Sequence, residues 1–394
     1  MKVLMAAPVM ARGFGLPEVI AALAPELERL GVGCEVACLS SDGLFDQLPV
    51  HEVEPTPEAV LALANRIGAD VVVAHGSPFF EVLPALRGKV RTVAYEHGEP
   101  PAVLFDDAAE RARREKYKVD HVYAHVDDVV AISEFIRSEI GWPDATVIPN
   151  GVDHIRDLGT KEWLPPRPPD APLRVGLLMR LGEGEARYKG NDMLEYLRRL
   201  ATERHGLVDA RWEVMGRGSD TDAARVAAAG FRCHLNATNA EREEYLRGLD
   251  VFVTLSKWEG CNLPLVEAQA LGTASLALDT GAHPEFAPLC FSSLDLMAAQ
   301  LRAYADDPLL LRAHGDLCYR YVRGQMSWPD SAAALVRLLG AEPAAGRRRW
   351  RRRGGESAVR RRLTNARDLY QAEGAGAVAR VALGKVRPKP ADSE

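Results

Sequence analysis

The chain has 394 residues, and at about 100 to 200 residues per domain this length predicts two or three domains. Hydrophobic residues make up 47% of it and charged residues 26%, which excludes wholesale disorder and collagen-like or low-complexity structure. No apolar run in the sequence approaches the roughly 20 residues that span a bilayer.

The N-terminal residues 1–11 form a short apolar run that fits either a buried first strand or a signal peptide. We predict a strand, because Pro8 and Arg12 end the run and a helical pattern follows at once. The six cysteines are scattered and contain no Cys-x-x-Cys pair, so neither a zinc site nor a disulfide framework is expected. These features predict a cytoplasmic protein.

Short apolar runs alternate with helical patterns along the first half of the chain. Predicted strands cover residues 2–8, 34–39, 70–75, 90–96, 128–133 and 146–149, and predicted helices cover residues 16–30, 57–67, 106–118 and 133–140. Strands that alternate with helices in this way indicate a doubly wound parallel sheet. Residues 1–160 are therefore predicted to form a Rossmann-like α/β domain.

Five prolines lie within residues 163–172, which predicts a stiff linker over residues 161–172. The alternation then resumes, with predicted strands at 173–179, 211–215, 232–235, 251–255 and 274–278 and predicted helices at 191–204, 219–229, 240–248, 264–271, 293–305 and 308–324. We predict a second Rossmann-like domain over residues 173–327 that faces the first across a cleft. A final helix over residues 328–340 and an Arg-rich tail over residues 341–394 complete the prediction.

The net charge of −6 is unevenly distributed. Residues 341–394 contain 14 Lys and Arg against 6 Asp and Glu, so that this tail carries +8 and residues 1–340 carry −14. The acidic body argues against nucleic acid as a partner. The tail fits peripheral contact with an anionic membrane or carrier, and it equally fits docking on the acidic body or plain solvation.

Residues 255–272 combine a strand end, a loop and a helix start. The strand ends near Ser256, and Asn262 is placed to cap a helix that has Pro264 in its first turn. Open α/β sheets bind ligands at the carboxyl ends of their strands, and the free N–H groups of a helix N-terminus bind anions. This segment is therefore predicted to hold a phosphate.

Two carboxylates flank the predicted phosphate position, Glu259 in the loop and Glu267 one turn into the helix. Carboxylates accept charge-assisted hydrogen bonds from sugar hydroxyls, worth about 1.5–3 kcal/mol each. The pair suits a ligand that has hydroxyls on both sides of a phosphate group. The alternative is an ordinary amphipathic helix with a solvated Glu267.

These residues resemble the signature of the family-4 retaining glycosyltransferases of GT-B fold, Glu-Gly-x-x-Leu-Pro-x-x-Glu-Ala-x-Ala-x-Gly. The likeness covers roughly residues 1–340. It implies an acceptor-binding first domain, a second domain that binds a nucleotide sugar, and a final helix that packs back on the first domain. It also implies that Glu259 contacts the donor hexose, that Glu267 contacts the ribose, and that the donor phosphate lies on the loop formed by Gly260, Cys261, Asn262 and Leu263.

Other positions match the family pattern near the two predicted sheets. Arg180 and Lys189 follow a strand, as do the two family cations that hold the donor diphosphate; fixed cations stabilise such a leaving group, and the alternative is ordinary surface charge. Gly15 lies where the family has a Gly-Gly pair that approaches the donor phosphates, with Phe14 at the first position. A plain strand-to-helix turn is the alternative for Gly15.

Two histidines, His75 and His97, end predicted strands in the first domain. The resemblance points to His97 as the residue close to the transferred sugar, and we group it with Glu259, Arg180 and Lys189 as the catalytic set. A structural role is the alternative for either histidine. Glu285 resembles the end of a family loop and is expected to support the site without touching the donor.

The triplet of Asp220, Thr221 and Asp222 matches a manganese-binding pattern of the other glycosyltransferase fold. It lies at a predicted helix start, where acidic residues complement the helix dipole. We therefore expect no metal and no other cofactor.

The resemblance implies transfer of a hexosyl unit from a nucleoside-diphosphate sugar, most commonly a UDP-sugar, to an acceptor hydroxyl with retention at the anomeric carbon. No local pattern identifies the acceptor, whether a small molecule, a glycan or a lipid-linked molecule. Two alternatives stay open: a sugar-nucleotide epimerase of the same fold, and a non-catalytic protein that binds sugar nucleotides. Under either alternative the protein is still predicted to be cytoplasmic, and peripheral contact with the inner membrane surface is compatible with this prediction.

Overall fold

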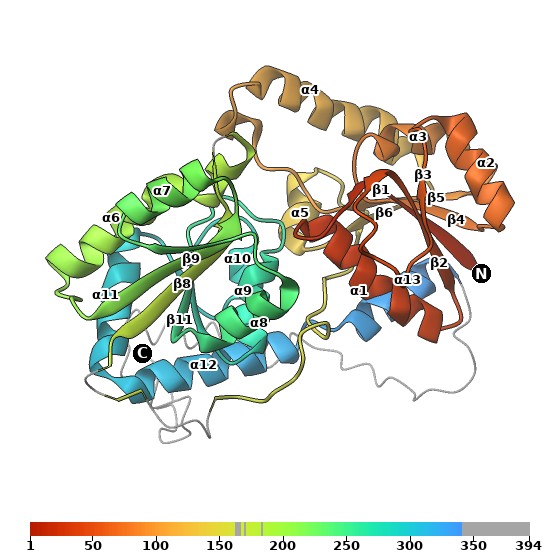
Figure 1. The fold of residues 1–394 in the computed structure, drawn as a ribbon. Coiled ribbons are helices and arrows are strands. Elements are labelled where there is room, and N and C mark those ends of the chain that lie inside the picture. Colours follow the sequence, from red (N-terminus) through yellow and green to blue (C-terminus); the bar gives the residue numbers. More distant parts are fainter. Residues whose placement is uncertain (162–166, 169–170, 183, 341–394) are drawn as a thin grey trace, which may run out of the picture.

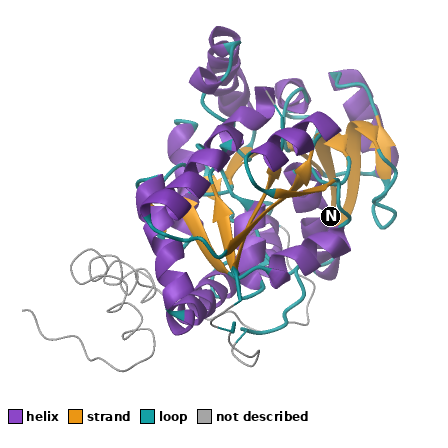
Figure 2. Ribbon diagram, turned by 60° about the vertical axis from the view of Figure 1, so that its left-hand side comes forward, coloured by secondary structure: helices purple, strands orange, loops and turns teal. Residues whose placement is uncertain are grey.

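Two parallel β-sheets organise the computed structural model, which describes residues 1–161, 167–168, 171–182 and 184–340 (Figure 1). Figure 2 shows helices around both layers of strands. The predicted α/β class with two doubly wound domains is therefore confirmed.

Several predicted segments lie outside the described residues. They are the tail over residues 341–394 and parts of the predicted linker, residues 162–166 and 169–170. Within the described ranges, no helix combines the length and the apolar character needed to cross a membrane.

The first domain is built on a seven-stranded sheet of order β3-β2-β1-β4-β5-β6-β7, with every neighbouring pair parallel. Its strands are β1 (Lys2–Met10), β2 (Gly33–Ser41), β3 (Val50–Glu52), β4 (Val71–Ala74), β5 (Arg91–Glu96), β6 (Asp128–Ala131) and β7 (Thr146–Val147). A continuous apolar run such as that of β4 is buried throughout, because helices cover both faces of a parallel sheet.

The helices of the first domain are α1 (Gly15–Arg29), α2 (Pro57–Ile67), α3 (Phe79–Leu86), α4 (Ala108–Tyr117) and α5 (Glu134–Glu139). Local signals set their ends: Thr56 Oγ1 accepts the N–H of Ala59 at the start of α2, and Gly68 follows its last turn in the left-handed conformation. Helix α3 lies outside the predicted helices. It has only eight residues, all of them apolar except Glu81, and it contains Pro84, and the pattern of such a short apolar run does not distinguish a helix from a buried strand.

The second domain contains a six-stranded parallel sheet of order β10-β9-β8-β11-β12-β13. Its strands are β8 (Leu173–Arg180), β9 (Ala210–Arg217), β10 (Arg232–Leu235), β11 (Val251–Thr254), β12 (Ala274–Leu278) and β13 (Cys290–Phe291). Its helices are α6 (Leu194–Arg199), α7 (Asp220–Ala228), α8 (Asn239–Gly248), α9 (Leu263–Ala270), α10 (His283–Phe286), α11 (Leu294–Asp306) and α12 (Pro308–Arg323).

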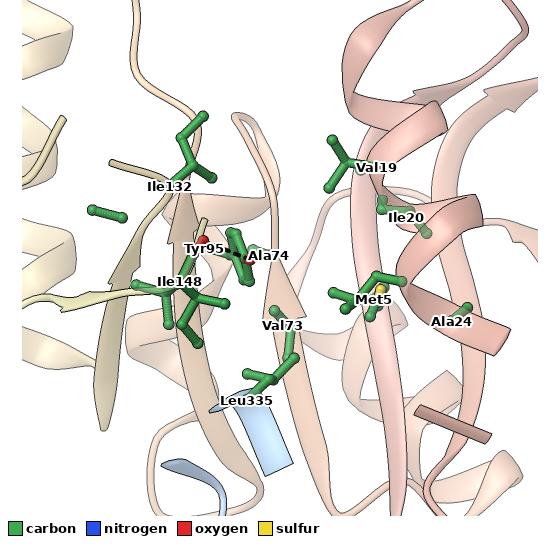
Figure 3. Packing of buried hydrophobic residues seen from close by; sticks show 14 of the residues in the cluster. Met5, Val19, Ile20, Ala24, Val73, Ala74, Tyr95, Ile132, Ile148 and Leu335 are labelled. Atoms are coloured by element: carbon green, nitrogen blue, oxygen red, sulfur yellow. Dashed lines mark hydrogen bonds between the residues drawn. The ribbon is translucent and has the colours of Figure 1, made fainter. Parts of the chain in front are cut away.

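Helix α13 (Trp328–Leu338) leaves the second domain and packs against α1 of the first (Figure 1). Leu335 of this helix is buried in the same core cluster as Met5 and Val73, and Figure 3 shows it beside Val73. Arg91 of β5 donates hydrogen bonds to the carbonyl oxygens of Leu338 and Leu339, at 2.9 Å each. The last described helix therefore belongs to the core of the first domain.

Candidate active site

A cleft of about 710 Å³ lies between the two domains. The loops that line it follow the carboxyl ends of β1, β5, β8, β9 and β11, because parallel strands place these ends at one edge of each sheet. Its wall includes residues 12–17, His97, Gly98, Arg180, Tyr188, Lys189, Gly216, Arg217, Arg242 and residues 258–264. Every predicted catalytic residue, and every predicted donor-binding residue except Glu267, lies on this wall.

The N-terminus of α9 borders the cleft. Asn262 caps the helix as predicted, since its Oδ1 accepts the N–H of Leu265 at 3.3 Å. Pro264 has no N–H, so the remaining donors at the helix start are the N–H groups of Asn262 and Leu263. Neither has a backbone acceptor within the described part of the chain. Free N–H donors at a helix N-terminus are groups that bind anions in proteins, and here two of them face the cleft wall.

His283 fixes the orientation of the Asn262 amide. His283 Nδ1 lies 2.9 Å from the carbonyl oxygen of Leu278 and carries the proton, so Nε2 accepts from Asn262 Nδ2 at 3.1 Å. The same Nδ2 donates to Thr254 Oγ1 at 2.9 Å. Burial lowers the pKa of His283, which keeps its Nε2 an acceptor at neutral pH. The amide therefore turns its oxygen toward the start of α9.

Lys189 and Glu259 form an ion pair on the cleft wall. Nζ and Oε1 lie 2.7 Å apart, with only 19% and 7% of the two side chains exposed. Burial disfavours the charged amine, but the adjacent Glu259 outweighs this effect and raises the pKa of Lys189. The backbone of Glu259 packs closely on Gly281, since a Cβ at position 281 would lie 2.6 Å from the Glu259 backbone nitrogen. The Lys189 amine is therefore charged, and the pair is held in place.

Tyr188 brings the second predicted cation, Arg180, next to Lys189. Arg180 Nη2 donates to Tyr188 Oη at 2.7 Å, and the Lys189 amine lies 4.8 Å from the centroid of the same ring. A short helical segment, Gly184–Lys189, takes up the residues that separate the two cations in the sequence. Both positive charges therefore reach the cleft in spite of their long spacing.

The N-terminus of α1 lies across the cleft from that of α9. A Cβ on Gly15 would be 3.7 Å from Leu263 Cδ1, and Phe14 at the helix start has no side-chain capping bond. Arg217, at the end of β9, places its guanidinium 5.1 Å from the centroid of the Phe14 ring and donates to the carbonyl oxygen of Arg12. Two helix N-termini and several cations thus meet in one cleft.

The two histidines that end strands in the first domain, His75 and His97, contact each other. His75 Nδ1 and His97 Nε2 are 2.9 Å apart, and both rings stack on Tyr95. His97 lines the cleft, whereas His75 is buried behind it. Burial lowers both pKa values, to about 4 for His97. Both imidazoles are therefore uncharged at neutral pH, and His75 is the partner of His97.

Glu267 is placed differently from the other predicted donor-binding residues, because its side chain is fully buried and does not line the cleft. Its Oε1 lies 3.0 Å from His154 Nε2 and 3.4 Å from Arg242 Nη2, and its Oε2 has no hydrogen-bond partner in the described structure. Burial favours protonation, but Arg242 and His154 lower the pKa of Glu267. Arg242 lines the cleft and so connects this carboxylate to the wall.

Glu285 joins the two domains. Its carboxylate accepts the backbone N–H groups of Glu134, at 3.0 Å, and Phe135, at 2.6 Å. These donors form the N-terminus of α5 in the first domain, where a negative charge is stabilised by the helix dipole. The predicted supporting residue therefore acts at the domain interface.

Two further contacts hold the domains together beside the cleft. Trp258 Nε1 donates to Glu139 Oε1 at 2.8 Å. Gly260 packs directly on the first domain, since a Cβ at this position would lie 2.3 Å from the carbonyl oxygen of His97. A side chain at residue 260 would separate the two walls.

Sequence reasoning missed three cleft residues, Tyr188, Arg217 and Arg242. A local pattern marks Arg217 as a candidate cleft residue, because it lies between two glycines at the end of a strand. Arg242 lies on the polar helix α8 and has no such signal. Its place on the wall depends on the packing of α8 beside α9.

Asp222 serves the structure of α7. Its Oδ2 accepts the backbone N–H of Ser219 at 2.9 Å, and its Oδ1 pairs with Arg225 at 3.0 Å. Together with the Ser219 hydroxyl this forms a capping box. No group of three or more potential metal-ligating side chains occurs among the residues that the structure describes. Metal independence stays a prediction.

Two Rossmann-like domains whose strand ends face one cleft form the GT-B arrangement. The chain belongs to the family-4 type of GT-B glycosyltransferases: Glycosyltransferase Family 4 matches residues 15–156, and Glycosyl transferases group 1 matches residues 177–299. No curated protein sequence matches the chain significantly.

Solved structures share this fold at low sequence identity. A sucrose-phosphate synthase from Thermosynechococcus elongatus has a TM-score of 0.67 at 14% identity, over 86% of this chain and 98% of that chain. The lipopolysaccharide outer core galactosyltransferase WaaB, in its apo form, has 0.61 at 14%, over 86% and 100%. The catalytic domain of starch synthase IV from Arabidopsis thaliana, bound to ADP and acarbose, has 0.61 at 14%, over 86% and 99%. At these identities the likeness establishes the fold alone.

Proposed function

We propose that this glycosyltransferase moves a hexosyl unit from a UDP-sugar to an acceptor hydroxyl, with retention of anomeric configuration and without a metal. The observation that carries the proposal is the convergence of Arg180, Lys189 and the N-termini of α1 and α9 on one cleft beside Glu259. Fixed cations and free helix N–H groups together suit a diphosphate. The ADP bound to the starch synthase neighbour supports the same class of ligand.

The proposed reaction exchanges one bond at the anomeric carbon for another on the same face of the sugar. The bond to the β-phosphate oxygen breaks, and its electron pair leaves with the diphosphate. The acceptor oxygen bonds to the anomeric carbon, and its proton passes to a diphosphate oxygen. Negative charge therefore grows on the diphosphate, and Arg180, Lys189 and the N–H groups at the start of α9 lower the barrier by binding that charge more tightly.

The remaining site residues hold the two ends of the donor. Glu259 accepts hydrogen bonds from the hexose hydroxyls, and its ion pair with Lys189 fixes its position. His97, uncharged and close to the sugar, hydrogen-bonds the hexose from the first domain. Glu267 binds the ribose. Arg242 lies on the cleft wall and also contacts Glu267, so movement of the Arg242 side chain opens the Glu267 carboxylate to the ligand.

A panel of nucleotide sugars tests the proposal by thermal unfolding. UDP-glucose, UDP-galactose, ADP-glucose and GDP-mannose are compared with and without EDTA, since a ligand at 100 times its Kd adds about 2.7 kcal/mol of stability. A UDP-sugar is expected to stabilise the protein equally in both conditions. Lys189→Met should abolish the effect. Lys257→Met is the matched control, because Lys257 pairs with Asp192 at 2.6 Å outside the cleft wall.

Product analysis then separates the alternatives. Release of UDP together with a glycosylated acceptor, examined by NMR for its anomeric configuration, is the expected result. Conversion of the donor to another sugar nucleotide without an acceptor would identify an epimerase. Nucleotide binding without turnover of any donor would favour a binding protein, and no stabilisation by any nucleotide sugar would contradict the proposal.

A further inference from the structure

A chain of hydrogen bonds connects Glu267 to the helix that returns to the first domain. The indole Nε1 of Trp328, the first residue of α13, lies 3.0 Å from His154 Nδ1. His154 Nε2 lies 3.0 Å from Glu267 Oε1. Trp328 and Glu267 are buried, and His154 retains 20% exposure. The chain thus joins a carboxylate of the second domain to a helix packed on the first.

The donors and acceptors of this chain follow from the chemistry of the groups. An indole nitrogen only donates, so His154 Nδ1 accepts and the imidazole proton lies on Nε2. Nε2 therefore donates to Glu267 Oε1. This oxygen also faces Arg242, whereas Oε2 has no partner among the described residues. The carboxylate is held by one oxygen, and the other meets a ligand hydroxyl only after movement of Arg242 opens this buried group to the cleft.

The backbone that carries this imidazole is fixed to both domains. Asp153 Oδ2 accepts the N–H of Trp328 at 2.6 Å, at the start of α13. On the opposite side, Arg323 Nη2 donates to the carbonyl oxygen of Ile155 at 2.9 Å and to that of Ala270, in α9, at 3.3 Å. The segment between the domains therefore touches α13 and α9 at once. The imidazole therefore lies in a segment whose position depends on the packing of α13.

We propose that His154 is a positioning residue for ribose recognition. Its Nε2–H orients Glu267 so that Oε2 meets a ribose hydroxyl, and its bond to Trp328 couples this orientation to the packing of α13 on the first domain. The inference rests on the proposed function, because it requires a nucleotide beside Glu267. It assigns discrimination between ribose and deoxyribose to a residue that lies more than a hundred positions before the signature segment.

A purely structural role for His154 predicts a different result. If the imidazole only satisfies a buried carboxylate, its removal lowers the stability of the fold and weakens the binding of ribonucleotides and dideoxyribonucleotides equally. If it orients Oε2, its removal weakens only the binding of the ligand that has ribose hydroxyls. The ratio of the two affinities therefore separates the roles.

The test measures the Kd of UDP and of 2′,3′-dideoxy-UDP by isothermal titration calorimetry. The wild-type chain is expected to prefer UDP by at least about tenfold, as hydrogen bonds to a buried carboxylate allow. His154→Leu should reduce this preference to about threefold or less, because the freed carboxylate no longer presents Oε2. His154→Gln retains an N–H donor and should keep most of the preference. Trp328→Phe, which removes the indole N–H together with one ring, should give an intermediate value.

A matched control removes a comparable contact elsewhere. His205 Nε2 lies 2.9 Å from Asp295 Oδ1, outside the cleft wall, so His205→Leu should leave the UDP preference unchanged. A wild-type chain that binds neither nucleotide contradicts the proposed function. A wild-type preference that His154→Leu fully keeps overturns the role of His154 and leaves the proposed function standing. If His154→Leu does not fold, an unchanged preference in Trp328→Phe overturns the proposal.

Discussion

Removal of the Lys189 charge should affect stability and turnover by different routes. The Lys189→Met change leaves Glu259 as a carboxylate with 7% of its side chain exposed and without the cation that now lies 2.7 Å away. Breaking a buried pair on one side costs about 3–5 kcal/mol. At about 2–4 °C for each kcal/mol in a domain of this size, the unfolding midpoint falls by roughly 10 °C.

Turnover should fall because a fixed cation no longer stabilises the leaving diphosphate. Removing one preorganised group of this kind costs about 2.7–4 kcal/mol of barrier, or roughly 10² to 10³ in kcat. The double variant Lys189→Met with Glu259→Gln separates the two effects. It removes the unpaired charge and should recover most of the midpoint, while the loss of turnover persists because the cation is still missing.

The assays are differential scanning fluorimetry and UDP release for wild type, both single variants and the double variant. Additive changes in the midpoint would contradict the ion pair as a coupled unit. Recovery of turnover in the double variant would refute the assignment of Lys189 to the diphosphate. Because Glu259 raises the pKa of Lys189, the pair stabilises the fold at neutral pH, and this contribution is lost only as the pH rises above the ordinary range of lysine.

Three further predictions concern the start of α9, the domain contact and the linker. Asn262→Asp places a carboxylate oxygen against the His283 Nε2 acceptor and a negative charge on the anion site, so the Kd of UDP should rise at least about tenfold; unchanged affinity in calorimetry would show that the anion binds elsewhere. Gly260→Ala puts a Cβ 2.3 Å from the carbonyl oxygen of His97. The kcat/KM for the donor should fall about a hundredfold, because the reacting groups lose their geometry. Wild-type kinetics in this variant would contradict the tight contact. Burial lowers the pKa of Lys161 from 10.5 to about 7. Between these pH values the unfolded chain binds one more proton than the folded chain, so the free energy of unfolding rises with pH by up to about 1.4 kcal/mol per pH unit. Urea unfolding between pH 7 and 9 should show this slope in the wild-type chain and lose it in Lys161→Met.

The framework of the fold could be predicted because its signals are local. The apolar run of β4 and the strand-loop-helix order around Asn262 are each contained within a few residues, and the structure forms both. The family resemblance also indicated Glu259 and Arg180, and both lie on the wall of one cleft. Helix α3 was not predicted because it is a run of only eight residues, apolar except for Glu81, whose length fits a buried strand equally well.

The surroundings of the site could not be predicted from the same signals. The sequence indicates that Glu267 lies one turn into a helix, but its burial and its contact with His154 depend on how that helix meets the segment between the domains. Arg242 likewise reaches Glu267 only because α8 and α9 pack together.

The sequence by itself determined the two parallel α/β domains, the start of α9 and the residue types that a diphosphate requires, because hydrophobic period, capping and turn chemistry act between near neighbours. Tertiary structure alone decided which side chains hold those residues in place. His283 orients Asn262 across 21 positions and Trp328 reaches His154 across 174. Such contacts depend on the order of the strands and on the return of α13 to the first domain, which no local pattern encodes.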